Sequence, residues 1–215
     1  MPSLSSISLG DGSFSDSLIF NISQLASLSL LEIGNDCFGL ADSFNLDGLN
    51  QLTSVSIGDG SFKNSTSLSL SNLVSFESLN IGNECFSNIG YFELDGLNAL
   101  KSLRIGQNSF TLNKNDYGFD KDRSFHITNC TSIKSIDIGK FSFSDYAGDF
   151  ELKELNSLET IRIGIINETS LNFYGSSLNV RGREFTPRIR IRPCKTRIPF
   201  GRRWIILERY FTQSF

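Results

Sequence analysis

Apolar residues recur along this chain at a spacing of about 24 positions. Each repeat holds an aliphatic residue followed by a glycine, and in six of the seven repeats a phenylalanine lies four positions after that glycine. The glycines are Gly10, Gly34, Gly58, Gly82, Gly106, Gly139 and Gly164. The first four intervals are 24 residues long, the fifth is 33 and the sixth is 25. Such a period predicts a solenoid, in which one structural unit stacks on copies of itself because no copy buries its apolar face alone.

The pattern within one repeat predicts two short β-strands. Residues 55–57 alternate apolar and polar side chains directly before a glycine, and Phe44 and Leu46 alternate in the same way on the opposite flank. The intervening apolar residues Leu46, Leu49 and Leu52 are three apart, which indicates a 3₁₀ or extended turn. No segment keeps the helical period for three turns. We therefore predict a mainly β solenoid of about six to seven coils with little helix.

The repeat resembles a known family. Residues 129–138 read Asn-Cys-Thr-Ser-Ile-Lys-Ser-Ile-Asp-Ile, and Gly106 is followed three and four positions later by Ser109 and Phe110. This pattern is similar to the leucine-rich repeat, in the BspA-like variety of bacterial and protist surface proteins, and it covers residues 4–165. The resemblance implies a leucine-rich-repeat solenoid.

The chain departs from that family at one position of each turn. The position that carries a hydrogen-bonded asparagine in the family holds mixed residues here, so we expect the asparagine ladder to be mostly absent. The backbone groups of these turns must then find other partners. The residues at this position are Gly12, Asp36, Gly60, Glu84, Asn108 and Phe141.

The sequence also shows a second, longer period of 48 residues, twice the length of the first. The repeats that start at Gly10 and Gly58 share Gly-Asp-Gly-Ser-Phe, whereas those that start at Gly34 and Gly82 share Gly-Asn-Asp/Glu-Cys-Phe and a later Leu-Asp-Gly-Leu-Asn. This alternation indicates that a pair of coils was the duplicated unit.

The strand before each glycine presents three outer columns when the repeats are stacked, because alternate residues of a strand face the same side. One column is mostly serine, one is glycine, and the middle one varies. We take the middle column as the candidate surface of a non-enzymatic protein-binding module, of adhesion or scaffold type. The alternative is that these positions are merely solvated. The column comprises Glu32, Ser56, Asn80, Arg104, Asp137 and Arg162.

The fifth interval contains nine additional residues, within positions 111–123. This insertion carries Tyr117 and Phe119 among alternating charges, and long insertions of solenoids often contact partners. These two aromatic residues are a second candidate contact. A neutral insertion that the fold tolerates is the alternative.

Charge divides the chain into two parts. Residues 1–180 hold 10 Lys and Arg against 21 Asp and Glu (−11), and residues 181–215 hold 10 against 2 (+8). We predict a solenoid over residues 4–165 and an irregular basic tail over 166–215, which is either a cap or the product of a wrong gene model. The Arg-rich tail provides an alternative function, binding of nucleic acid or an anionic surface. The acidic body repels phosphate, so a protein partner is favoured over nucleic acid.

Residues suited to catalysis or metal binding are sparse. His126 is the one histidine, so any Ser-His-Asp or Cys-His arrangement would depend on it alone. Asn113, Asn115 and Tyr117 only faintly match a calcium loop, which needs a glutamate where Ser124 stands. No Gly-Lys-Ser/Thr motif for phosphate is present. We therefore expect no catalytic site, no metal and no cofactor.

The four cysteines do not form a disulfide framework. Cys37 and Cys85 occupy the same position two coils apart, about 9–10 Å, which exceeds the ~7 Å limit for a bridge. Cys130 occupies a core position and is expected to be a buried thiol. Only Cys194 remains for another role.

The compartment depends on what precedes the chain. No run of 18 apolar residues is present, so we expect no membrane span. The chain opens inside a repeat without a signal segment, and we expect it to be an N-terminally incomplete fragment. The protein is then at the cell surface or secreted if a signal is missing, and cytoplasmic otherwise. The sequons at Asn21, Asn64, Asn129 and Asn167 are glycosylation sites only in the first case.

Overall fold

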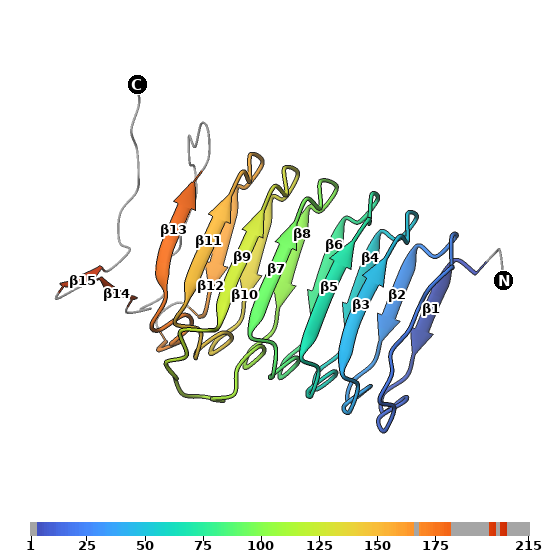
Figure 1. Cartoon of the computed structure of the whole chain (residues 1–215), viewed down its shortest axis with the longest axis horizontal. Coiled ribbons are helices and arrows are strands. Elements are labelled where there is room, and N and C mark those ends of the chain that lie inside the picture. Colours follow the sequence, from blue (N-terminus) through green and yellow to red (C-terminus); the bar gives the residue numbers. More distant parts are fainter. Residues whose placement is uncertain (1–3, 166–167, 182–197, 201–202, 206–215) are drawn as a thin grey trace.

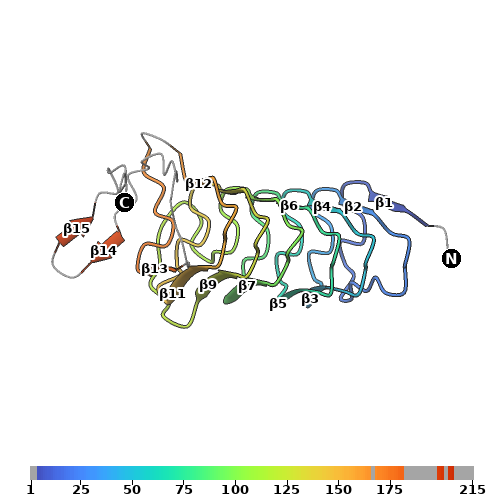
Figure 2. The same ribbon diagram turned by 90° about the horizontal axis from the view of Figure 1, so that it is seen from above.

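The computed structural model describes residues 4–165, 168–181, 198–200 and 203–205. Within them the chain forms a parallel β-solenoid of about seven turns with a period near 24 residues, and these residues contain no helix (Figure 1). Each coil after the first contributes one strand to each of two walls that face each other, as the view from above shows (Figure 2). The mainly β solenoid predicted from the sequence is thus confirmed.

The first wall is a sheet of seven parallel strands, each directly followed by one of the periodic glycines. In spatial order these strands are β1 (Ser6–Leu9), β2 (Leu30–Ile33), β4 (Ser54–Ile57), β6 (Ser78–Ile81), β8 (Ser102–Ile105), β10 (Ser135–Ile138) and β12 (Thr160–Ile163). Every residue lies opposite its counterpart in the next repeat, as Leu79 does opposite Leu103. The period of the sequence is therefore the period of the stack.

The second wall consists of two separate parallel sheets. One contains β3 (Ser43–Asp47) and β5 (Ser67–Ser71), and the other contains β7 (Tyr91–Asp95), β9 (Ser124–Thr128), β11 (Asp149–Lys153) and β13 (Ser177–Arg181). Because β13 pairs with β11, the parallel stacking continues beyond residue 165. A short antiparallel hairpin joins β14 (Ile198–Phe200) to β15 (Arg203–Ile205). The other tail residues beyond Arg181 lie outside the described residues.

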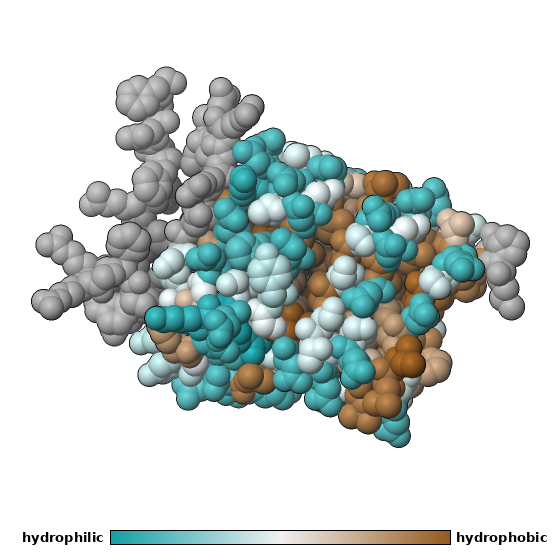
Figure 3. All heavy atoms as spheres, viewed as in Figure 1, coloured by the Kyte–Doolittle hydropathy of each residue, from teal (hydrophilic) through white to brown (hydrophobic). Residues whose placement is uncertain are grey.

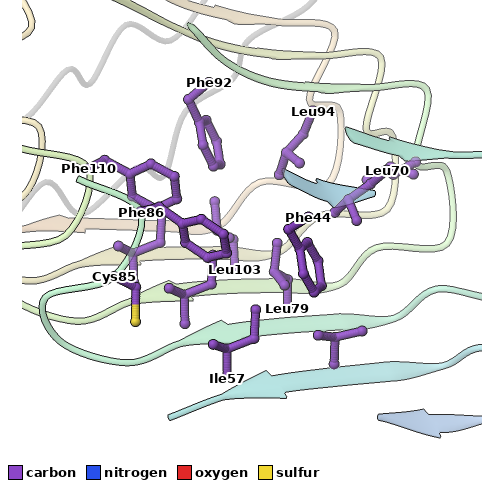
Figure 4. Close-up of a cluster of buried hydrophobic side chains, with 14 of the residues drawn as sticks. Phe44, Ile57, Leu70, Leu79, Cys85, Phe86, Phe92, Leu94, Leu103 and Phe110 are labelled. Carbon is purple, nitrogen blue, oxygen red and sulfur yellow. The ribbon is translucent and has the colours of Figure 1, made fainter. Parts of the chain in front are cut away.

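A column of stacked phenylalanine rings runs through the core. Its members are Phe14, Phe38, Phe62, Phe86, Phe110, Phe143 and Phe173. Neighbouring ring centroids are 4.8–5.3 Å apart, and Figure 4 shows two members, Phe86 and Phe110, beside aliphatic side chains of the first wall. All seven residues have a φ between 51° and 56°, a left-handed conformation that is unfavourable for a bulky side chain. Packing of each ring on its neighbours holds the backbone in this conformation.

The glycine column lies where consecutive coils approach each other most closely. A Cβ on Gly82 would lie 2.7 Å from the carbonyl carbon of Gly58 and 2.7 Å from the backbone nitrogen of Asp59. These are backbone atoms, so they have no side-chain torsion through which to move away. At Gly10, in the first coil, a Cβ would meet nothing within 4 Å. The recurrence of glycine is therefore required by the spacing of the coils.

Replacement of Gly82 by alanine is expected to lower the free energy of unfolding by about 2 kcal/mol, because the methyl group forces two coils apart. For a chain of this size the loss corresponds to a decrease of roughly 4–8 °C in the melting temperature. The matched control is Gly10→Ala, which adds the same methyl group in open space and should melt like the wild type. Equal melting temperatures of the two variants, measured by circular dichroism, would contradict the packing explanation.

A ladder of side-chain hydrogen bonds joins the turns after the glycines. The backbone N–H of Asn35 donates to Oδ1 of Asp11 at 2.7 Å, and that of Asp59 donates to Oδ1 of Asn35 at 2.7 Å. The backbone N–H of Asn83 in turn donates to Oδ1 of Asp59 at 2.8 Å. The position predicted to lack an asparagine ladder lies one residue later, and its N–H groups bond to backbone carbonyls, as Asp36 does to Asp59 at 2.8 Å. The hydrogen-bonded ladder therefore occupies the position before the one at which the family resemblance places it.

Candidate binding surface

The six candidate residues of the variable column lie side by side on the outer face of the first wall. The strand register places Glu32, Ser56, Asn80, Arg104, Asp137 and Arg162 opposite one another in this order. Adjacent strands are about 4.8 Å apart, so the column spans roughly 24 Å. All six side chains are exposed or half-buried. The structure therefore brings these residues together on one face.

Short polar side chains occupy part of this face. In the neighbouring column the hydroxyl of Ser78 donates to that of Ser54 at 2.8 Å, and within the variable column Nδ2 of Asn80 donates to the hydroxyl of Ser56 at 3.2 Å. The third column is glycine and has no side chains. The face thus offers hydroxyl and amide groups close to the backbone.

Arg104 differs from its neighbours on this face because its guanidinium is exposed and has no carboxylate partner among the described residues. The carboxylate of Asp137, opposite it on β10, is instead 3.2 Å from Nη1 of Arg162. A guanidinium presents five N–H donors in a planar fork, a geometry that suits a carboxylate. Arg104 is therefore the side chain of the column best suited to hold an acidic group of a partner.

The two aromatic candidates of the insertion lie apart from this face, on the connection between β8 and β9 (Figures 1 and 2). The ring of Tyr117 is 4.2 Å from that of Tyr174, between centroids. The ring of Phe119 lies so close to Gly175 that a Cβ there would overlap it. Tyr117 and Phe119 remain 48% and 62% exposed. They therefore cover a neighbouring turn and present their other surface to solvent.

A buried polar cluster, which sequence analysis missed, holds the base of the insertion. Nη1 of Arg123 is 3.3 Å from Oδ2 of Asp145, and the two side chains are only 5% and 3% exposed. Nη2 of Arg123 donates to the carbonyls of Ser87 and Ile89 at 2.8 and 2.7 Å. Asp145 also accepts the backbone N–H of Leu112 at 3.0 Å. Closed off from solvent, this cluster positions the loop rather than a ligand.

The histidine lies on the outer face of the second wall. Nδ1 of His126, on β9, is 3.4 Å from Oε2 of Glu151, and its ring centroid is 5.1 Å from that of Tyr91. Neither a serine nor a cysteine nucleophile bonds to it within the described part of the chain. Its contacts are thus an acidic and an aromatic neighbour on the same wall.

The cysteines of the described residues are buried free thiols: Cys37, Cys85 and Cys130. The predicted absence of a Cys37–Cys85 bridge is confirmed, as is the core position of Cys130. Burial raises the pKa of Cys85 to about 12 and that of Cys130 to about 11, so both thiols stay protonated at neutral pH. Cys194 lies outside the described residues.

Among the described residues, no group of three or more His, Cys, Asp or Glu side chains is placed to hold a metal ion. No helix in this part of the chain is long and apolar enough to cross a membrane.

Comparison of the chain with models of protein families, with curated proteins and with solved structures finds no match. The geometry itself shows a parallel β-solenoid with a 24-residue period, which is compatible with a repeat protein.

Proposed function

We propose that this chain is a non-enzymatic protein-binding module of the leucine-rich-repeat type, in its BspA-like variety, and that it acts in adhesion or as a scaffold. The binding surface is the outer face of the first wall. The observation that carries the proposal is the exposed guanidinium of Arg104, which has no carboxylate partner among the described residues and lies beside the short polar side chain of Asn80.

The chemistry of this face suggests the kind of partner. Arginine is enriched among the residues that dominate the energy of protein interfaces. Here Arg104 provides a charge that a partner carboxylate would neutralise, while Ser56 and Asn80 provide shorter-range hydrogen bonds beside it. The serine and glycine columns leave room for a partner to approach the sheet closely. The expected partner is a protein with an acidic side chain at the centre of its contact surface.

Charge reversal tests this proposal. A tagged chain is used to capture proteins from the cells that produce it, and the affinity of the captured protein is then measured for Arg104→Glu. The variant is expected to bind at least tenfold more weakly, because two carboxylates replace an ion pair at the interface. Arg162→Glu should have a smaller effect, since Arg162 already pairs with Asp137.

The matched control is Lys153→Glu, which reverses an exposed charge on β11 of the second wall. This variant should bind like the wild type. If Arg104→Glu keeps the wild-type affinity, or Lys153→Glu loses as much as Arg104→Glu, the outer face of the first wall is not the binding surface.

A further inference from the structure

The second wall is interrupted between β5 and β7, although the first wall is continuous at the same junction. On the first wall β4 and β6 pair residue by residue. On the second wall β5 pairs with β3 and β7 pairs with β9, and within the described residues no ladder joins β5 to β7. The carbonyl of Ser71 accepts the N–H of Gly48 from the preceding coil, but no such bond runs from Asn72 to Asp95 in this part of the chain. The two coils are joined on one side and open on the other.

The 48-residue period of the sequence coincides with this gap. Asp47 accepts hydrogen bonds from the side chains of Ser71 and Asn72 at 2.6 and 2.7 Å, which ties its coil to the next one. Asp95, 48 residues later, accepts two bonds from the coil that follows it, at 2.5 and 2.8 Å. The coil between them has Ser71 in place of an aspartate. The junction of β5 and β7 therefore lacks both this carboxylate tie and a backbone ladder, whereas the β9–β11 junction has Thr128 at the aspartate position and keeps its ladder.

A second irregularity lies on the inner side of the wall. Phe44 stacks on Phe20, and Phe92 stacks on Phe125, in each case with 5.0 Å between ring centroids. Leu68 of β5 stands between Phe44 and Phe92 in the same row and is only partly buried. A leucine fills less space than a ring, so the aromatic row is interrupted at β5, the strand that borders the open junction.

The two interruptions leave a groove of about 610 Å³ between β5 and β7. Its lining includes the apolar side chains of Leu68 and Leu70 and the carboxylates of Glu93 and Asp95, but no Lys, Arg or His. Val74, also in the lining, is 69% exposed. On this face Figure 3 shows hydrophobic side chains (brown) between polar ones near the middle of the molecule. The volume lies in the range of about 300–1,000 Å³ that is typical of ligand sites.

We propose that this groove binds an extended peptide of a partner protein in which apolar side chains alternate with basic ones. The facing edges of β5 and β7 supply unpaired backbone donors and acceptors, as in other sites where a peptide adds to a sheet. Apolar side chains of the peptide contact Leu68 and Leu70, and its basic side chains pair with Glu93 and Asp95. A strand occupies about 4.8 Å, so full insertion places β5 and β7 about 9.6 Å apart, with the β4–β6 pair as the hinge.

The carboxylates of Asp95 and Glu93 have properties that suit pairing with basic side chains. The hydrogen bonds from Thr128 and Asn129 lower the pKa of Asp95, which keeps its side chain ionised at neutral pH. Glu93 accepts a hydrogen bond from the hydroxyl of Tyr91 at 3.1 Å and is exposed at the surface. The lining holds no cation, although Lys153 of β11, outside it, favours the charged form of Asp95, so a basic peptide would supply positive charge within the groove.

Binding of a synthetic peptide to the full chain tests the proposal. The probe is a fluorescein-labelled nine-residue peptide of alternating valine and arginine, and binding is measured by fluorescence anisotropy. The reference peptide has the same composition with the valines and arginines in separate blocks. We expect the alternating peptide to bind at least tenfold more tightly, because only it presents one apolar and one basic face as a strand. Equal affinity of the two peptides would show attraction by charge alone and would overturn the proposal.

Variants of the groove locate the site. Leu68→Phe, which completes the aromatic row, should weaken binding of the alternating peptide at least tenfold while the chain stays folded. Glu93→Gln removes one negative charge without changing the shape of the side chain, and it should weaken binding of the alternating peptide three- to tenfold. The control Glu151→Gln, in the same column on β11 but outside the groove, should leave the affinity unchanged. If Glu93→Gln and Glu151→Gln have the same effect, the peptide does not bind in the groove.

The tail of the chain itself contains a segment in which basic and apolar residues alternate, as they do in the proposed peptide. Arg188, Arg190 and Arg192 alternate with isoleucine in the tail, outside the described residues. Reversal of all three to glutamate in the full chain should leave the peptide affinity unchanged if the groove is free for a partner. A more than threefold rise in affinity would show that the tail occupies the groove, and the proposal of a partner peptide would be wrong.

Discussion

Replacement of Phe143 by alanine is expected to lower the free energy of unfolding by about 4 kcal/mol. Phe143 is fully buried and stacks between Phe110 and Phe173, at 4.8 and 5.1 Å between ring centroids. It also meets Phe125 and Tyr146 edge-on, at 5.0 and 4.9 Å. Its removal leaves a cavity and breaks the ring column at one coil, and the left-handed backbone there loses the packing that holds it.

Phe14 provides the matched control for this prediction. It occupies the same position in the first coil, has a similar φ of 54° and stacks on Phe38, but it is 60% exposed. Phe14→Ala should therefore cost less than about 1.5 kcal/mol, since the ring loses contacts on one side only. Urea unfolding followed by circular dichroism measures both variants. A loss for Phe143→Ala as small as that for Phe14→Ala would mean that the ring column does not stabilise the solenoid.

Replacement of Arg123 by alanine is expected to lower the free energy of unfolding by about 3–4 kcal/mol, because it leaves the buried carboxylate of Asp145 without its counter-charge. The variant also loses the hydrogen bonds to the carbonyls of Ser87 and Ile89. Since this cluster holds the base of the insertion, trypsin should cleave at Lys114 and Lys121 faster than in the wild type.

The control for this variant is Arg162→Ala, which removes an exposed ion pair with Asp137 on the outer face. An exposed pair contributes about 1 kcal/mol or less, so this variant should unfold close to the wild type and keep the wild-type cleavage pattern. Equal stability of the two variants, or unchanged cleavage at the insertion in Arg123→Ala, would contradict the role assigned to the buried cluster.

The regular parts of the fold could be predicted from the sequence because the glycine and core positions of the stack repeat one residue type or a few similar ones. The glycine column and the phenylalanine column each recur with the period of the coils, and both have a physical cause in the structure: close backbone approach at Gly82 and ring stacking at Phe143. The alternation of residues 55–57 predicted which side chains of β4 point inward, and the structure buries Val55 and Ile57. The column around Arg104 follows from the same register.

The irregular parts of the fold depend on contacts between residues that do not recur with the 24-residue period. Arg123 and Asp145 are 22 positions apart, and they meet because the insertion changes the spacing between two coils, so their pairing has no counterpart in the other repeats. The gap between β5 and β7 did leave a signal in the sequence. Leu68 stands where Phe44 and Phe92 recur, and the aspartates at 47 and 95 skip one coil. That signal becomes interpretable only when the structure shows which coils the aspartates join.

The two proposed sites lie on opposite walls and differ in charge and shape. The proposed site on the outer face of the first wall includes the cationic side chain of Arg104, whereas the groove of the second wall is acidic and partly apolar. The first site is therefore expected to bind an acidic surface and the second a basic strand. Arg104→Glu should leave the affinity for the alternating peptide unchanged, which separates the two sites experimentally.

Site-specific photo-crosslinking tests the central claim, binding of a protein through the outer face of the first wall, most directly. A photo-reactive amino acid replaces Asn80 on β6 in one chain and Asn45 on β3 in another; both are exposed asparagines, and they lie on opposite walls. In extracts of the producing cells, the account predicts a crosslinked protein from position 80 that position 45 does not give, and loss of this product when Arg104→Glu is added. The same product from both positions, or from position 45 alone, would contradict the account.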